Sequence, residues 1–171
     1  MFDGAGNHPE QTLARDRSWK PSCEHESMTA DHPRLGAVVL DTTDARSLAE
    51  FYRELLGYAY RPGDEPPTDG TPDTGGHDWL VLRDETGHSR LAFQQVAEMP
   101  RSTWPHPDVP QQLHLDFTVP TSDDLVDQRQ RALTLGATIL EDRFDDPDEP
   151  LYVFADPAGH PFCIFVAPDA S

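Results

Sequence analysis

One order of predicted elements, strand, helix, strand, strand, strand, occurs twice along this chain of 171 residues. The first copy spans residues 34–98 and the second residues 111–168, with a proline-containing linker at 99–110 between them. Each copy supplies one helix, which can cover only one face of its strands. We therefore predict an α+β fold of paired βαβββ modules. Their eight strands would form a curved mixed sheet, with the helices on its outer face and a central trough for a ligand.

The two helices have the clearest patterns. In the first, apolar residues recur at i, i+3, i+4, i+7 and i+8, which predicts one buried helical face. These residues are Leu48, Phe51, Tyr52, Leu55 and Leu56. Thr43 or Asp44 can cap this helix, and Gly57 suits a left-handed end. In the second copy, a helix is predicted over residues 123–135 after a cap at Thr121 or Ser122.

The strands are predicted from short apolar or alternating runs that are bounded by turn residues. In the first module they cover residues 35–40, 58–60, 79–82 and 91–96. In the second module they cover residues 112–119, 137–140, 151–155 and 161–166. Turns at 84–88 and 156–159 join the last two strands of each module.

The charge of the chain excludes several classes of partner. It contains 31 acidic and 13 basic residues, a formal net charge of −18. We expect neither nucleic acid nor an anionic membrane surface as a partner, because no basic patch exists to bind phosphates. No apolar run is long enough to cross a bilayer, and no signal peptide is recognisable, so the expected location is cytoplasmic. Residues 1–33 are expected to form a flexible N-terminal extension.

The segment from Gln112 to Phe117 alternates polar and apolar residues, which places Gln112, His114 and Asp116 on one strand face. We expect this face to line the trough. His114 is then the candidate catalytic residue, as a general base or hydrogen-bond donor. The alternative is a structural histidine whose ring is satisfied by Asp116.

Two further side chains are expected to bind the ligand. Gln94 alternates with Ala92 and Val96 and should also face the trough, where its neutral amide would recognise a polar ligand. Trp104 lies between prolines near the mouth of the trough and could stack on a ligand or pin the linker. His160, which follows the turn glycine, is expected at the surface, with the pocket rim as the alternative.

The chain resembles the vicinal oxygen chelate superfamily, which includes glyoxalase I, bleomycin-resistance proteins and extradiol dioxygenases. The resemblance covers about residues 34–168. It rests on the paired layout, the helix at 44–57, the His114–Asp116 motif and the segment DPAGHPFC at 156–163. FQQV at 93–96 and the stretch 104–117 are similar to a glyoxalase-like subgroup. This resemblance implies a single domain, a small-molecule ligand and a homodimer.

In the superfamily's metal enzymes, four inward side chains hold a divalent ion. The resemblance places Ala37, Gln94, His114 and Cys163 at those positions. Only His114 matches the usual ligand type, since Ala37 carries no donor atom and Cys163 is soft. No cofactor is therefore predicted, with a divalent metal as the alternative. Ala37 and Cys163 are nevertheless expected to line the ligand pocket, Cys163 either as an inert buried thiol or as a reactive one.

Three functions stay open at this point. The first is a metal-independent protein that binds a small organic molecule. The second is an enzyme, a lyase or dioxygenase that uses His114 with or without a metal. The third is a non-catalytic interaction module whose trough is filled by its own side chains or by the N-terminal extension.

Overall fold

A computed structural model describes residues 32–167. The predicted extension at 1–33 lies outside this range except for its last two residues. The residues described from Leu35 onward belong to one compact unit, which is described by itself below. Within residues 32–167, no helix is both long and apolar enough to cross a membrane.

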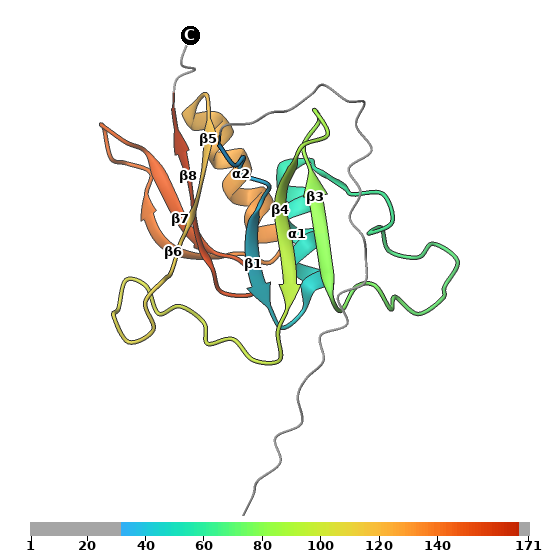
Figure 1. Cartoon of the computed structure of the whole chain (residues 1–171). Helices are drawn as coiled ribbons and strands as arrows, with labels where there is room; N and C mark the ends of the chain where they lie inside the picture. The colour runs from blue at the N-terminus through green and yellow to red at the C-terminus, as the bar shows by residue number, and fades with distance from the viewer. Residues whose placement is uncertain (1–31, 168–171) are drawn as a thin grey trace, which may run out of the picture. The chain divides into compact units, whose positions relative to one another are not determined.

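The first module is a four-stranded sheet covered on one face by a helix (Figure 1). Along the chain it comprises β1 (Val38–Thr42), α1 (Ala45–Leu56), β2 (Ala59–Tyr60), β3 (Trp79–Arg83) and β4 (Ser89–Gln95). The strand order is β1-β4-β3-β2, in which β1 runs parallel to β4 and the other pairs are antiparallel.

The second module repeats this topology. It comprises β5 (Leu115–Val119), α2 (Ser122–Thr134), β6 (Thr138–Arg143), β7 (Leu151–Ala155) and β8 (Pro161–Val166). The strand order is β5-β8-β7-β6, and β5 runs parallel to β8. The paired βαβββ layout and the α+β class are confirmed. The eight strands form two mixed sheets of four, however, with no hydrogen-bonded ladder among the described residues that joins them into one.

The helix ends agree with the sequence. Asp44 is the N-cap of α1, and its side chain accepts a hydrogen bond from the amide of Ser47 at 3.0 Å. Gly57 ends α1 in the left-handed conformation, with φ of 68°. Thr121 caps α2 by accepting the amide of Asp124 at 3.1 Å. These local hydrogen bonds satisfy amides that the helix itself leaves unpaired.

Two strand starts differ from the prediction, and both differences affect the site. β1 begins at Val38 rather than residue 35 and extends to Thr42. β5 begins at Leu115 rather than residue 112, because its parallel partner β8 begins at Pro161 and the first paired residues are Leu115 and Phe162. Residues 112–114 therefore lie ahead of the strand, where strict alternation of side chains no longer applies.

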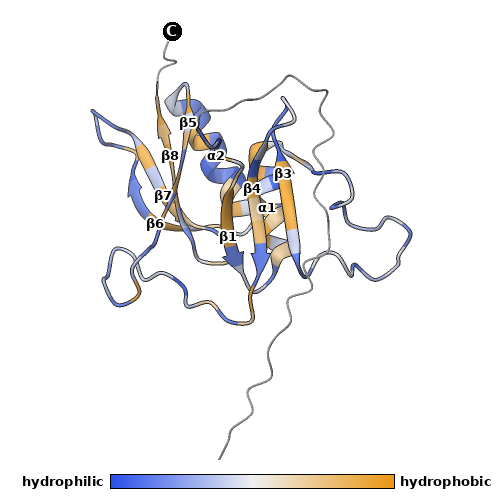
Figure 2. Cartoon of the chain, in the orientation of Figure 1, coloured by the Kyte–Doolittle hydropathy of each residue, from blue (hydrophilic) through white to orange (hydrophobic). Residues whose placement is uncertain are grey.

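Aromatic side chains fill the core between α1 and both sheets. Tyr52 and Phe162 are fully buried. The ring of Tyr52 lies within 5.8 Å of Phe93 in the first module and 6.3 Å of Phe162 in the second, measured between centroids. Figure 2 shows the hydrophobic residues concentrated on the strands, whereas the loops are mainly hydrophilic. One hydrophobic core thus holds both modules together.

The turns before β4 and β8 share the sequence Asp-x-x-Gly-His. In both, the amide of the glycine donates to the carbonyl of the aspartate at 2.9 Å, and the aspartate amide donates to the histidine carbonyl at 3.0 Å. An aspartate oxygen also accepts the histidine amide, at 3.0 Å for Asp84 and His88 and at 2.9 Å for Asp156 and His160. The two modules therefore share the hydrogen bonds of this turn as well as the order of their elements.

Replacing Phe162 with alanine should destabilise the protein by about 3–5 kcal/mol, because the change opens a cavity in the shared aromatic core. Chemical denaturation measures this loss. The control is Val126→Ala on α2, where the side chain is 44% exposed and the expected change is below about 0.5 kcal/mol. Equal effects of the two substitutions would contradict the placement of the core.

Candidate functional site

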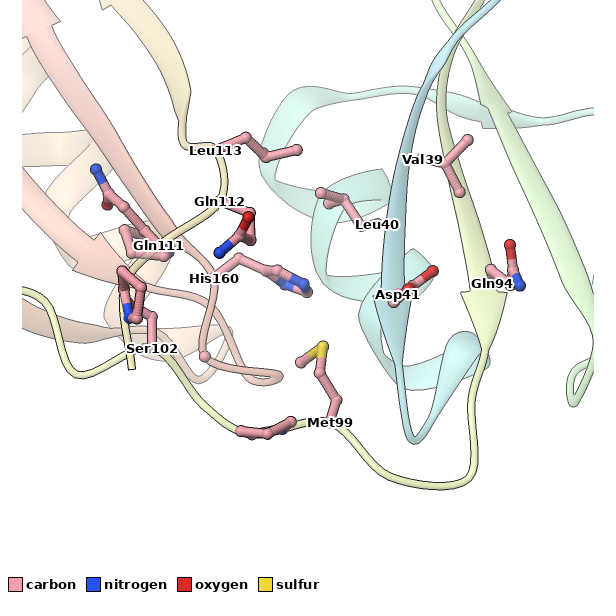
Figure 3. Close-up of a pocket in the computed structure, with 14 residues that line it drawn as sticks. Val39, Leu40, Asp41, Gln94, Met99, Ser102, Gln111, Gln112, Leu113 and His160 are labelled. Carbon is pink, nitrogen blue, oxygen red and sulfur yellow. The ribbon is translucent and has the colours of Figure 1, made fainter. Parts of the chain in front are cut away.

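A cavity of about 460 Å³ lies beside β1 and β4, against the ends of the linker and the turn before β8 (Figure 3). The residues that line it come from five stretches of the chain. They are Val39, Leu40, Asp41, Gln94, Met99, Pro100, Ser102, Pro110, Gln111, Gln112, Leu113, Gly159, His160 and Pro161. Apolar side chains and prolines form much of this wall, and a few polar groups interrupt it.

The linker is fixed against the second module by Arg101. The guanidinium of Arg101 donates to the carbonyl of Pro157, and its aliphatic part lies over Gly159. A Cβ atom at Gly159 would stand 2.7 Å from Cγ of Arg101, and the φ of Gly159 is +101°, so only glycine fits. Arg101 itself contacts Pro157 and Gly159, whereas its neighbours Pro100 and Ser102 line the cavity.

The middle of the linker closes on itself and stays outside the cavity wall. The amide of Thr103 donates to the carbonyl of Val109 at 2.9 Å, and the amide of Val109 donates to the hydroxyl of Thr103 at 2.8 Å. Trp104 lies inside this closed loop, and its peptide bond to Pro105 is cis. Trp104 is not among the residues that line the cavity.

The polar groups of the cavity lie on opposite sides of it. Asp41 and Gln94 are paired positions of the parallel strands β1 and β4. Across from β1, Gln112 and His160 extend from the second module, and Met99 projects toward His160 (Figure 3). Asp41 and His160 are the only ionisable residues in the described lining, which contains no lysine or arginine.

His160 is held by a buried carboxylate. Its Nδ1 lies 2.9 Å from Oδ2 of Asp156, which is 2% exposed. The hydroxyl of Tyr52 donates to the same Oδ2 at 3.0 Å. Burial and the negative charge of Asp156 raise the pKa of Tyr52 well above its ordinary value, so this phenol stays protonated. The three side chains form a connected chain from the core to the cavity.

Sequence reasoning expected His160 at the surface, with the pocket rim as the alternative, and gave it no role. Its side chain is 17% exposed and lines the cavity. The sequence did contain one indication of this residue. The pattern Asp-x-x-Gly-His occurs in both modules and places a histidine directly after the turn glycine each time. The ring's own partner, Asp156, is close in the sequence, but Tyr52, which donates to the same carboxylate, is 104 positions away from Asp156. A contact of that separation is invisible to local patterns.

His114, Asp116 and Cys163 form a separate cluster on the second sheet. One potential ligand atom from each lies within 4.8 Å of the others. Nε2 of His114 is 3.5 Å from Oδ1 of Asp116, and both side chains are largely exposed. Asp116 and Cys163 are paired positions of β5 and β8. Burial and the neighbouring Asp116 carboxylate raise the pKa of the Cys163 thiol to about 11, so it is protonated at neutral pH.

Apart from Trp104, the predicted site residues are thus divided among three places. Gln94 and Gln112 line the cavity. His114, Asp116 and Cys163 lie together outside the described lining. Ala37, which precedes β1, is absent from that lining too, and Val39 contributes from this strand instead.

The four positions that the superfamily uses for its metal do not fit a metal ion here. Ala37 offers no donor atom, and the amide of Gln94 is a weak ligand. Cys163 would have to lose a proton from a thiol whose pKa is raised, and its sulfur suits softer ions. This set therefore contains one good ligand, His114.

Comparison with known proteins agrees with the architecture. The model of the family described as "Glyoxalase-like domain" matches residues 37–165, which is most of the chain. The chain belongs to this family. The glyoxalase-like domain of this chain is therefore a member of the vicinal oxygen chelate superfamily, as its motifs indicated. No curated protein matches the chain.

Solved structures show the same fold at low sequence identity. A glyoxalase/bleomycin resistance protein/dioxygenase family enzyme from Burkholderia phytofirmans PsJN is 16% identical, with a TM-score of 0.53 over 77% of this chain and 96% of that one. A glyoxalase/dioxygenase from Nostoc punctiforme is 18% identical, with a TM-score of 0.54 over 80% and 92%. A hypothetical protein from S. aureus is 13% identical, with a TM-score of 0.55 over 81% and 100%. These likenesses establish the fold alone.

In the glyoxalase-like domain, Cys163 should react with iodoacetamide slowly at neutral pH. Its rate should rise to half of its maximum near pH 11, because only the thiolate attacks. The chain has two cysteines, Cys23 and Cys163, so a Cys23→Ser background leaves Cys163 as the single thiol for mass spectrometry. Asp116→Asn should shift the profile to lower pH, because it removes a nearby negative charge. A thiol that is fully reactive at neutral pH would contradict this environment.

Proposed function

We propose that this glyoxalase-like domain binds a small organic molecule in its cavity and does so without the superfamily's usual metal site. The observation that carries this proposal is the cavity itself. Its volume of about 460 Å³ lies in the range of small-molecule pockets, and its wall combines apolar side chains with a few placed polar groups. Ala37 offers no donor atom and Gln94 only a neutral amide, so the residues at the superfamily's metal positions support binding without a metal.

The charges around the cavity narrow the class of ligand. The described lining contains Asp41 but no lysine or arginine, and the chain as a whole carries a net charge of −18. An anionic ligand would meet this carboxylate without a compensating cation. The proposed ligand is therefore a neutral or cationic organic molecule, whose apolar part packs on Leu40, Met99 and Leu113. Its polar groups would bond to the amides of Gln94 and Gln112.

A ligand-observed NMR screen of neutral, cationic and anionic compounds tests this proposal. Hits should come from the neutral and cationic sets, and Gln94→Ala should weaken their binding about fivefold, the effect of one lost hydrogen bond of about 1 kcal/mol. The control is Gln130→Ala, on the exposed surface of α2, which should leave binding unchanged. No hits from a broad collection, or hits insensitive to Gln94, would contradict the proposal.

A second candidate function follows from the cluster of His114, Asp116 and Cys163. One nitrogen, one oxygen and one sulfur ligand within 4.8 Å form a mixed set of the kind that binds zinc. A lyase or dioxygenase of this superfamily could use such a site, with His114 as the essential ligand.

Elemental mass spectrometry of tag-free protein separates the two candidates. We expect no stoichiometric metal in the wild type or in His114→Ala, because Cys163 holds its proton at neutral pH. About one equivalent of a transition metal per chain, lost in His114→Ala, would replace the metal-independent proposal with the second candidate. Gln130→Ala serves again as the matched surface control.

We also propose that the protein forms a homodimer and is located in the cytoplasm. Pairing of two copies is common in this superfamily, and the molar mass in solution, measured by light scattering, tests it directly.

A further inference from the structure

We propose that His160 is the proton-accepting residue of the cavity and that Asp156 and Tyr52 are the residues that position it. The ligand would then present an O–H or N–H group to Nε2 of His160. This inference rests on the proposed function, since it concerns the same cavity. It adds the requirement that the ligand carries an O–H or N–H group that can reach Nε2 of His160.

The hydrogen bonds of Asp156 fix its role. Oδ1 accepts the amides of Gly159 at 2.8 Å and His160 at 2.9 Å. Oδ2 accepts the hydroxyl of Tyr52 and faces Nδ1 of His160. A carboxylate buried in this way is stable as an anion only when donors surround it. Four contacts from donors on the two oxygens meet that condition.

These contacts determine the tautomer of His160. An ionised carboxylate can only accept hydrogen bonds, so Nδ1 of His160 must carry the proton that it shares with Oδ2. In the neutral ring the other nitrogen, Nε2, then holds a free lone pair. Because Tyr52 also donates to Oδ2, the carboxylate has no proton to give to the ring.

The ring is presented to the cavity. The backbone of His160 is held by the turn, and its side chain extends from the second module toward β1, beside Gln112 and Met99 (Figure 3). No hydrogen-bond partner for Nε2 is found among the described residues. The acceptor nitrogen is therefore available to a molecule in the cavity.

The equivalent turn in the first module shows that the turn itself does not require this arrangement. There, Oδ2 of Asp84 pairs with Arg90 at 2.5 Å, and Nδ1 of His88 lies 2.6 Å from the hydroxyl of Thr86. The backbone hydrogen bonds are the same, but within residues 32–167 no hydrogen bond joins the ring of His88 to Oδ2 of Asp84. The contact between His160 and Asp156 is thus an addition to the turn, made only beside the cavity.

The step that this geometry supports is a single proton transfer. The proton of the ligand's O–H or N–H bond moves to Nε2, and the electron pair of the broken bond stays on the ligand. The imidazolium that forms is stabilised by Asp156, in the way that a buried carboxylate supports histidine in other general bases. Reversal returns the proton, so no oxidant or further reactant is needed.

The tautomer can be observed directly with ¹⁵N-labelled histidine in the full chain. Two-bond ¹⁵N–¹H spectra distinguish protonated from bare ring nitrogens, and His160→Gln assigns the signals. We expect protonated Nδ1 and bare Nε2 for His160 in its neutral form. A neutral His160 with protonated Nε2 would overturn the proposal. The tautomer itself is read from the wild type, and the variant serves only to assign the signals.

Asp156→Asn gives a sharper test. The amide oxygen is needed at the Oδ1 position, which accepts two backbone amides, so the NH₂ group takes the place of Oδ2. It would then donate to Nδ1 and move the ring proton to Nε2. The matched control is Asp84→Asn in the other turn, which should leave the tautomer of His160 unchanged. A tautomer that persists in Asp156→Asn would overturn the assignment to Asp156.

Acylation by diethyl pyrocarbonate reports whether Nε2 is available. Peptide mass spectrometry should find His160 modified in the wild type, and Asp156→Asn should slow this modification about tenfold, which corresponds to a tautomer preference of about 1.4 kcal/mol. Asp84→Asn should not change the rate. Equal rates in both variants would overturn the proposal. None of these experiments uses a ligand, so a failed compound screen contradicts the proposed function alone.

Discussion

The hydrogen bond from Tyr52 to Asp156 is the interaction on which the cavity depends. It joins α1 of the first module to the turn before β8 in the second, deep in the shared aromatic core. A buried carboxylate is costly unless its oxygens are occupied, so the loss of one partner would leave an unpaired charge in an apolar environment. The same carboxylate holds the turn and the ring of His160. The relative position of the modules and the wall of the cavity are therefore linked through one side chain.

The two Asp-x-x-Gly-His turns show how one local motif can serve two purposes. Both use the aspartate to close the backbone, which is a local requirement of the chain reversal. They differ in the surroundings of the second carboxylate oxygen. In the first module this oxygen pairs with Arg90, whereas in the second it faces Tyr52 and His160. The chemistry of a motif is thus set by the core against which it packs.

The sequence predicted the elements better than the site, and the reason is the range of the interactions involved. The helix caps at Asp44 and Gly57 depend on neighbours within one turn, so the local pattern sufficed. The strand β5 was predicted too long because its start is set by pairing with β8, a distant segment. His114 and Gln112 were therefore placed on one face, although the structure separates them. His160 is connected to Tyr52 only through Asp156, and no local pattern links this turn to α1.

The position of the linker has a consequence for how such a cavity can change. Both ends of the linker line the cavity, whereas the hydrogen bonds of the two sheets involve none of its residues. Its middle is closed by Thr103 and Val109, and Arg101 anchors it to the turn. Substitutions at Met99, Ser102 or Pro110 can reshape one wall while the strands and the core stay intact. The shape of the cavity can therefore change without a matching loss of stability.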